Sequence, residues 1–425
     1  MANIKTFKAI RYNEEKFPVP PVAPPYDIIS EKQRQTFAAN EYHMINLEKP
    51  GCDDDKDRYS KAADRFASWK NTGVMIEEEE AVYYVYAQRF KHPETEEVFE
   101  RTGFYGLVEL EEHYENCIYP HERTLSAPKA DRLDLMKSTK ANLSPVFGLY
   151  DDPENKAEQI FESVKKNNPI YNTYVDNDGT EHFIWKITSA DDQKVLSGVL
   201  SGKDIIIADG HHRYATALNY RNEMREKNGV KTEKQPYDYV LMCLINFNNS
   251  GLVVLPTHRL FCLNVESEKM LAEASDYFDI LETTYEEAEK ILLNKKEGSY
   301  ILAYYCGKSE ETFLLTLKED ANLSGVVPDS PSEDWRKLEV NLLFYIIIKK
   351  ILNIGEDDFQ TKIKYTHSFL ETREVVDAGE AQCAFLLPAN TKDELEKVTQ
   401  AHEVMPQKST YFFPKVFAGF VLYKH

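Results

Sequence analysis

The sequence lacks several features that would place it in a familiar class of proteins. Its six cysteines form no CxxC pair, so their spacing favours neither a disulfide framework nor a zinc knuckle. The longest apolar run, Leu342 to Ile348, is far shorter than the ~20 residues that a membrane-spanning helix needs. The amino terminus has no apolar signal-peptide core. We therefore expect a cytoplasmic protein that does not enter a membrane.

The sequence also lacks the common phosphate-binding and metalloprotease motifs. It contains no GxxxxGK(S/T) loop, no Rossmann GxGxxG and no HExxH. Positive charge is scarce, because 51 lysines and arginines face 71 acidic residues and the formal net charge is −20. This balance argues against nucleic acid and anionic membranes as partners. A small phosphorylated ligand is still compatible with it, where basic residues gather locally.

The chain has 425 residues, which is enough for a sizeable core and two or three domains. Near its centre it contains a strand–turn–helix pattern. Branched apolar residues at 205–207 predict a buried strand, and Asp209 with Gly210 predicts a turn. Apolar residues at helical spacing then predict a helix from 214 to a glycine stop at 229. Four polar or flexible residues occupy the start of that helix: Gly210, His211, His212 and Arg213.

This turn has the chemistry of an anion site. Free backbone N–H groups and the helix dipole favour an anion at a helix start. Gly210 allows close approach of the backbone, and Arg213 can bind phosphate oxygens through its fork of donors. Asp209 would face the same spot and hold a metal ion or a hydroxyl group. In the alternative interpretation Asp209 only caps the helix, and the two histidines are surface polar residues.

Two upstream segments add candidates. The proline-rich segment 1–30 predicts extended backbone that either wraps a domain or places Asp27 rigidly at the mouth of a site. The segment 118–135 concentrates polar side chains: His121 or Glu122 as a general base, and Arg123, Lys129 and Arg132 as phosphate ligands. Its alternative interpretation is a solvated loop followed by an ordinary amphipathic helix.

Two downstream segments are equally open to two interpretations. His258 and Arg259 follow an apolar run, which suits either a pair of ligand anchors or the polar end of an edge strand. In the tail, Lys408, Ser409, Thr410 and Lys415 lie among aromatic residues and suit a phosphate with a base. The tail also has the pattern of a plain carboxyl-terminal strand. Separately, the run 43–47 predicts a short strand, and residues 335–352 predict a buried helix.

The central stretch 208–218, ADGHHRYATAL, resembles the phosphate-binding turn of the ParB/sulfiredoxin-like superfamily. Its form is similar to that of SerK-type free-serine kinases and of a large bacterial family of unknown function that contains them. Three further segments, 22–29, 121–133 and 405–415, also resemble that bacterial family. The resemblance to the family covers nearly the whole chain, whereas the resemblance to the kinases depends mainly on the central turn.

This resemblance implies an α+β, multidomain protein with a ParB/sulfiredoxin-like core. We expect an amino-terminal region at 1–150, the core at 151–262 and a further α/β region at 263–425. The implied activity is a kinase that uses ATP or ADP with Mg²⁺ and converts free L-serine to O-phosphoserine. The residues implied are Asp209, His211 and Glu122 for catalysis, with Asp209 also on the metal; Gly210, His211, His212, Arg213, Arg123, Lys129, Arg132, Lys408, Ser409 and Thr410 for the nucleotide phosphates; and Asp27, His121, His258 and Arg259 for the substrate.

Three other functions fit the same residues. The first is a phosphatase acting on a phosphorylated amino acid. The second is a non-enzymatic, nucleotide-binding protein of the ParB kind. The third is a transition-metal site at His211 and His212, which would require irregular backbone because adjacent residues do not share a helix face. A nucleotide and a small-molecule substrate are the partners that the first interpretation implies.

Overall fold

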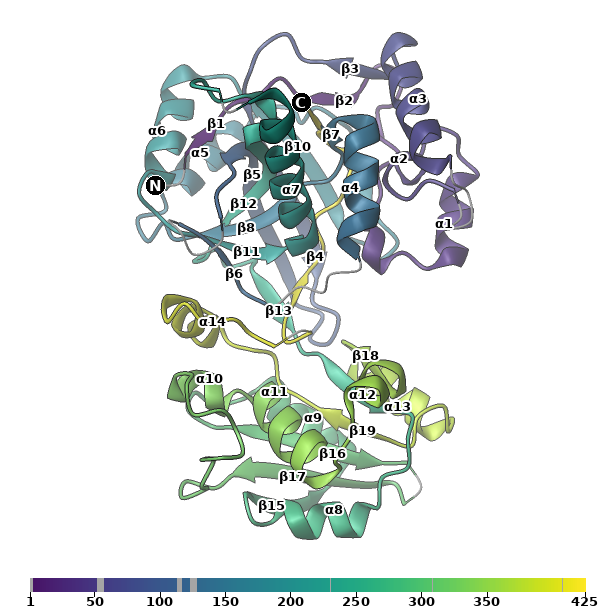
Figure 1. The fold of residues 1–425 in the computed structure, drawn as a ribbon, viewed down its shortest axis with the longest axis vertical. Coiled ribbons are helices and arrows are strands. Elements are labelled where there is room, and N and C mark those ends of the chain that lie inside the picture. Colours follow the sequence, from purple (N-terminus) through teal and green to yellow (C-terminus); the bar gives the residue numbers. More distant parts are fainter. Residues whose placement is uncertain are drawn as a thin grey trace.

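The chain forms two bodies, each built on a β-sheet, which lie one above the other in Figure 1. The structure, a computed structural model, describes residues 3–51, 57–112, 117–122, 128–229, 231–307, 309–406 and 408–425. At 128–130, 356, 357 and 360 it describes only the backbone. The fold is mixed α/β with several sheets, as the sequence predicts.

In the described ranges, the first body is organised around a nine-stranded sheet. Its path runs β6 (Ile118–Pro120), β11 (Ile205–Asp209), β8 (Val146–Tyr150), β12 (Tyr239–Asn246), β5 (Val98–Glu109), β4 (Tyr83–Lys91), β10 (Glu181–Ile187) and β9 (Tyr174–Val175), with β1 (Ile4–Lys5) paired to β5. β11 runs parallel to β6, and β12 runs parallel to β8. Within 81–110 and 170–187, β4 pairs with β5 and β9 pairs with β10 as antiparallel hairpins.

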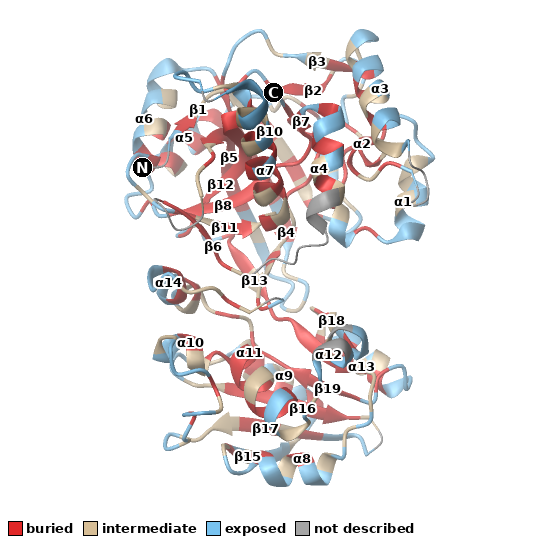
Figure 2. Ribbon diagram, in the orientation of Figure 1, coloured by how far each residue is buried: buried red, intermediate tan, exposed pale blue. Residues whose placement is uncertain are grey.

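Both faces of this sheet are covered, so β11 is a buried strand. Ile205 and Ile207 pack with residues of α5 (Lys156–Val164), α6 (Ala190–Leu200) and α7 (His211–Asn228). The other face packs against the proline-rich arm, α3 (Arg58–Asn71) and the carboxyl-terminal tail. Figure 2 shows the buried residues gathered on the strands of both bodies. Burial on both faces explains the run of branched apolar residues in β11, which does not alternate with polar ones.

The remaining elements of the first body are short. They are β2 (Ile10–Tyr12), paired with β3 (Met75–Glu77), a 3-10 turn (Tyr26–Ile28), α1 (Glu31–Ala38), α2 (Ile45–Glu48), α4 (Pro128–Thr139), β7 (Ala141–Asn142) and a second 3-10 turn (Pro236–Asp238). α4 lies against both α3 and α7. The turn Tyr26–Ile28 presents Asp27 to solvent.

The second body is built on an antiparallel sheet. Its strands run β15 (Phe278–Thr283), β17 (Glu311–Leu317), β16 (Ile301–Cys306), β19 (Cys383–Leu386), β14 (His258–Phe261) and β18 (Ile363–Thr366). Its helices are α8 (Ser267–Ala274), α9 (Tyr285–Leu293), α10 (Glu333–Lys337), α11 (Glu339–Leu342), a π-helix (Leu343–Ile351), α12 (Glu356–Lys362), α13 (Phe369–Asp377) and α14 (Lys392–Gln400). In the part of the chain that the structure describes, no helix is both long and apolar enough to cross a bilayer.

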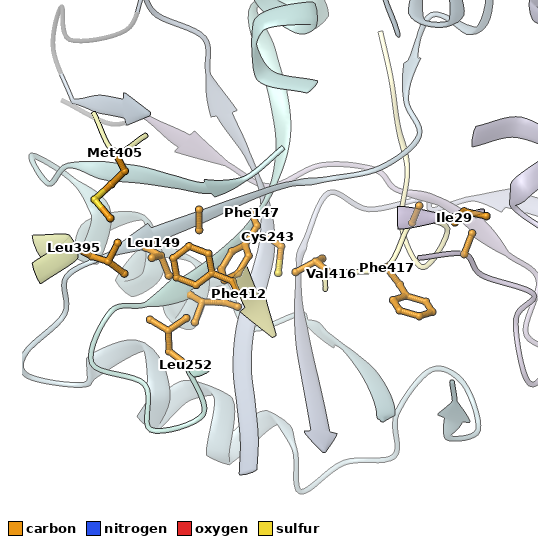
Figure 3. Packing of buried hydrophobic residues seen from close by; sticks show 14 of the residues in the cluster. Ile29, Phe147, Leu149, Cys243, Leu252, Leu395, Met405, Phe412, Val416 and Phe417 are labelled. Atoms are coloured by element: carbon orange, nitrogen blue, oxygen red, sulfur yellow. The ribbon is translucent and has the colours of Figure 1, made fainter. Parts of the chain in front are cut away.

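The chain crosses to the second body and then returns. β13 (Val253–Leu255) leads out of the first body and pairs with β20 (Tyr411–Phe413) of the returning tail. The tail ends in β21 (Tyr423–Lys424), which pairs with β7. Phe412 of the tail packs against Phe147 of the large sheet, with ring centroids 5.6 Å apart (Figure 3). The end of the chain is therefore part of the core of the first body.

The expected domain limits can be compared with this pairing. The large sheet takes strands from both sides of residue 150, so that limit lies inside one sheet. The second body begins with β14 at His258, close to the limit expected at 262. The tail from about residue 405 returns to the first body, apart from the rest of the expected region 263–425. Pairing between strands that are distant in the chain determines where each body begins and ends. Amino-acid composition does not predict that pairing.

Two local predictions differ from the structure. The strand predicted at 43–47 is wrong, because Ile45–Glu48 forms helix α2. His43 accepts the Ile45 N–H at 3.2 Å and so favours a helical turn, while the short apolar run suits either structure. The single helix predicted at 335–352 is divided, because Leu338 has an extended ψ of 131°.

Candidate functional site

The predicted strand, turn and helix at the centre of the chain are confirmed. β11 ends at Asp209, after a register shift against β8, and α7 begins at His211. Gly210 between them has φ +86°, in the left-handed region that favours glycine. A Cβ atom at Gly210 would lie only 2.8 Å from the Nε atom of Arg213. Glycine is therefore required here both for the backbone angle and for the space that the guanidinium occupies.

The carboxylate of Asp209 joins two cationic side chains. It accepts a hydrogen bond from Arg213 through Oδ2, and one from the Lys415 amino group through Oδ1 at 2.9 Å. Burial alone would raise the pKa of the Asp209 carboxyl, but the charges of Lys415 and Arg213 outweigh burial and hold this pKa below its usual value. Asp209 is therefore an ionised group between two cations and provides no side-chain cap to α7.

The two cations are held in turn by their surroundings. Arg213 also donates to the carbonyl oxygen of Pro145. Burial would lower the pKa values of Arg213 and Lys415, whereas the carboxylate of Asp209 raises both above their usual values. The charge of Asp27 acts in the same direction on the pKa values of both groups. Asp209, Arg213 and Lys415 thus form a charged cluster in which two cations surround one central acid.

His121 connects the end of β6 to β11 and to the tail. Its Nδ1 lies 2.5 Å from the carbonyl oxygen of Ile207, and its Nε2 lies 2.6 Å from the hydroxyl oxygen of Thr410. Since a carbonyl oxygen only accepts, Nδ1 carries a proton, and in the neutral ring Nε2 accepts the Thr410 hydroxyl proton. The rings of His121 and His211 lie 4.7 Å apart. Three of the predicted site residues, His121, Thr410 and His211, are thus brought together.

Glu122 lies next to this histidine pair. Its Oε1 is 3.7 Å from Nδ1 of His211. Burial raises the pKa of the Glu122 carboxyl, and the neighbouring charges of His121 and Lys415 oppose this only in part. The backbone of Glu122 forms a parallel bridge with Met405 at the edge of β6. A carboxyl group with a raised pKa beside two imidazoles has the properties of a general base.

Beside Lys415 of the predicted tail segment lie Tyr411 and His367, which sequence reasoning did not place in the site. The Lys415 ammonium lies 4.2 Å from the ring centroid of Tyr411. On its other side, Tyr411 stacks with His367 at a centroid distance of 3.7 Å. Burial lowers the pKa of His367 to about 4, so this ring is neutral at pH 7. The basic tail in an acidic chain was a signal for Lys415, while nothing in the sequence around His367 indicated a role.

Arg132 lies beside the turn Tyr26–Ile28. Its guanidinium lies 4.1 Å from the ring centroid of Tyr26 and donates to the carbonyl oxygen of Glu48 at 2.6 Å. It also forms an ion pair with Asp131. Arg132 and Arg213 both line a small internal cavity of about 40 Å³. Arg132 therefore supports the turn that carries Asp27.

Other predicted residues lie between the two bodies. His258 is buried in β14 and accepts the Leu387 N–H at 3.2 Å, while burial lowers its pKa to about 3. Arg259 donates to the carbonyl oxygens of Thr257 and Lys408. The side chain of Lys408 is exposed, and the Ser409 hydroxyl donates to the Pro406 carbonyl at 2.5 Å. These residues connect the tail to the second body.

Three further candidates complete the comparison. His212 is half-buried in the first turn of α7. Arg123 lies outside the described residues, and Lys129 begins α4 with its backbone described and its side chain outside the description. These two therefore remain predictions.

The described residues offer little to a resident metal ion. Both Asp209 oxygens accept from cationic side chains, and no group of three metal-ligating side chains is present among the residues that the structure describes. The donor set around Asp209 therefore does not fit a resident Mg²⁺ ion. Mg²⁺ also binds in proteins through one or two carboxylates together with substrate phosphates.

A larger cavity is lined in part by residues of the same strands. It has a volume of about 390 Å³, and its lining includes Tyr119, Ile206, Leu149 and Phe247, together with Gln400 and His402. Tyr119 precedes His121 by two residues on β6, and Ile206 precedes Asp209 by three on β11. At the rise of a strand these spacings are about 7–10 Å. The cavity thus lies close to the charged cluster.

Together these features define a class: a mixed α/β protein of two bodies, with the charged cluster of Asp209, Arg213 and Lys415 at a glycine-opened helix start. The chain belongs to the family described as "Protein of unknown function (DUF1015)", whose model matches residues 4–341. No curated protein matches the chain.

Solved structures with low similarity to the chain are known. One is a conserved hypothetical protein from Pyrococcus furiosus, 17% identical, with 73% of this chain and 93% of that chain covered and a TM-score of 0.35. A free serine kinase in complex with AMP is 15% identical, with 75% and 91% covered and a TM-score of 0.37. A variant of a free serine kinase in complex with ADP is 16% identical, with 75% and 92% covered and a TM-score of 0.38.

Proposed function

We propose that this protein is a nucleotide-dependent phosphotransferase whose acceptor is the hydroxyl group of a small molecule. The observation that carries the proposal is the cluster of Asp209, Arg213 and Lys415 at the glycine-opened start of α7. Phosphoryl transfer depends chiefly on positioning and on neutralising charge. Two buried cations at the start of a helix, where the helix dipole also favours an anion, supply that neutralisation. Free L-serine is the acceptor that the sequence resemblance favours.

The step proposed uses groups that lie within one region. The acceptor oxygen forms a bond to the terminal phosphorus, while the bond from that phosphorus to the nucleotide oxygen breaks. The acceptor hydroxyl proton passes to Glu122, whose raised pKa suits a base that works near neutral pH. Arg213 and Lys415 each keep further donor hydrogens for the transferring phosphoryl oxygens. Asp209 holds both cations in place.

The nucleotide enters as its Mg²⁺ complex, with the ion as part of the substrate. This assignment agrees with the commitment of both Asp209 oxygens to Lys415 and Arg213. The cavity of about 390 Å³ is of a size that takes a nucleoside, and its aromatic residues Tyr119 and Phe247 suit a base. Tyr119→Ala should therefore weaken binding of ADP more than binding of inorganic phosphate, as measured by calorimetry.

The direct test is to incubate the purified protein with L-serine, Mg²⁺ and either ATP or ADP. We expect O-phosphoserine, detected by ³¹P NMR, and its loss in Lys415→Met. Lys364→Met is the matched control, because Lys364 is exposed on β18 in the second body.

The outcomes separate the candidate functions. Release of phosphate from O-phosphoserine without nucleotide would support a phosphatase. Tight nucleotide binding without turnover on any amino acid would support a binding protein. Equal activity of the wild type and Lys415→Met would show that the charged cluster has no role in the mechanism.

A further inference from the structure

A second buried arginine contacts the tail just before Lys415. Arg101 of β5 is 1% exposed, and its guanidinium lies 5.0 Å from the ring centroid of Phe147. It donates through Nη1 to the Phe413 carbonyl at 3.1 Å and through Nη2 to the Pro414 carbonyl. Among the described residues it forms no ion pair with a carboxylate, and its Nε atom has no hydrogen-bond partner.

Gln88 completes this contact from the neighbouring strand. Gln88 of β4 and Arg101 of β5 are directly opposite each other in the antiparallel ladder. The Gln88 side-chain oxygen accepts from Arg101 at 2.5 Å, and its amide nitrogen donates to the Lys415 carbonyl at 2.9 Å. Three consecutive tail carbonyls, at 413, 414 and 415, are therefore held by two adjacent side chains of the large sheet.

The other end of the tail segment is held in a similar way from the second body. Arg259 of β14 is 4% exposed and donates to the Lys408 carbonyl at 2.9 Å. Burial lowers the pKa of Arg101 and of Arg259 to about 10 in each case, so both remain charged at pH 7. The segment 408–415 is thus fixed at each end by a buried guanidinium from a different body.

Such arginines are costly for the folded state. A buried charge without an opposite charge is unfavourable, and neutral donors satisfy carbonyl groups at lower cost. What the guanidinium adds is a rigid, planar fork that spans two carbonyl groups at once. That geometry sets the path of the backbone from Phe413 to Lys415, and hence where the Lys415 amino group lies relative to Asp209.

We propose that Arg101 and Gln88 are positioning residues that hold the tail so that Lys415 reaches Asp209, with Arg259 fixing the opposite end of the segment. The catalytic part of this inference rests on the proposed function. The placement of Lys415 by Arg101 and Gln88 is independent of the proposed function. Arg101 acts through the tail backbone and does not contact the acceptor or the nucleotide.

The test measures the accessibility of Lys415 directly, by acetylation of the full-length protein followed by mass spectrometry. In the wild type, Lys415 should label slowly, because its side chain is 10% exposed and paired with Asp209. In Arg101→Met its labelling rate should rise about tenfold, since the local opening of the tail becomes easier. Arg101→Lys should fall in between, because a lysine can reach one carbonyl but cannot span two.

Arg221→Met is the matched control. Arg221 is also a buried arginine of the first body and donates to the Leu110 carbonyl at 2.7 Å, but its hydrogen bonds are to Leu110, Glu112 and Asn222 and not to the tail. It should lower the melting temperature without changing the labelling of Lys415. Lys364 serves as the internal exposed reference in every sample. If Arg101→Met does not fold, Gln88→Leu provides the same comparison.

This experiment distinguishes failure of the positioning role from failure of the proposed function. Unchanged protection of Lys415 in folded Arg101→Met or Gln88→Leu would overturn the inference. Increased labelling of Lys415, together with a wild type that turns over no nucleotide, would support the inference and reject the proposed function. If turnover is present, Arg101→Met should raise the KM for the nucleotide about tenfold, with Arg221→Met near the wild-type value.

Discussion

The amino group of Lys415 lies 2.9 Å from the Oδ1 atom of Asp209, although 206 positions separate these residues in the chain. Asp209 ends β11, while Lys415 follows β20 in the returning tail. Because Asp209 also accepts from Arg213, one carboxylate fixes two cations at the start of α7. The charged cluster therefore forms only when the tail packs against the first body.

The first prediction is that Asp209 and Lys415 are energetically coupled. A double-mutant cycle with Asp209→Asn and Lys415→Met should give a coupling free energy of about 1–3 kcal/mol, measured by urea unfolding. Lys415→Met should also lower kcat/KM by about 10²–10³-fold, because it removes a charge that stabilises the transferring phosphoryl group. A coupling near zero would contradict the ion pair.

A second prediction concerns stability and pH. The folded-state pKa of Asp209 is depressed, so its contribution is present above the unfolded value of about 3.9 and is lost as the pH falls through the folded value. The folded-state pKa of Lys415 is raised, so its contribution is present below about pH 10.4 and is lost as the pH rises through the folded value.

The difference in unfolding free energy between the wild type and Asp209→Asn should therefore be constant from about pH 5 to 8 and shrink in stronger acid. Asp276→Asn is the control, since Asp276 is exposed. A difference that instead grows as the solution becomes strongly acidic would reject this assignment of the Asp209 charge.

Glu122→Gln gives the third prediction. Because burial raises the folded-state pKa of Glu122, the folded protein disfavours its charged form, and the glutamine variant should be at least as stable as the wild type at pH 7. Its kcat should nevertheless fall by about 10²–10⁴-fold, as expected for loss of a general base. The acidic limb of the pH–rate profile should disappear as well. An unchanged kcat would assign the base elsewhere.

The fourth prediction separates two effects of glycine. Gly210→Ala introduces a Cβ both into left-handed backbone and against the Arg213 guanidinium, which is 2.8 Å away at its Nε atom. Gly298 of the second body has a similar φ of +75°, but nothing lies within 4 Å of the position that a Cβ atom would take there. Gly298→Ala should destabilise the fold by about 1–2 kcal/mol, the effect of left-handed backbone alone.

Gly210→Ala should destabilise the fold more than Gly298→Ala in the same thermal unfolding assay, and of the two variants only Gly210→Ala should reduce nucleotide binding. Equal losses of stability with unchanged binding would show that the guanidinium moves aside freely.

Several parts of the fold follow from the sequence because their causes are local. The period of apolar residues, the glycine at 210 and the stop at 229 predict β11, its turn and α7 in their observed order. The hairpins β4–β5 and β9–β10 follow from the same kind of pattern. The run 43–47 shows the limit, because its three apolar residues suit a helix as well as a strand.

Local residue order is enough to specify which groups stand at the start of α7, since a glycine turn after a buried strand depends on neighbouring residues only. What meets those groups depends on the folded chain as a whole. Lys415 reaches Asp209, and His367 stacks on Tyr411, because β20 pairs with β13 and draws the tail between the two bodies. Arg132 turns inward to Tyr26 because α4 packs on α3 and α7. Such contacts arise from pairing between distant strands and helices, and no local pattern of residue types encodes them.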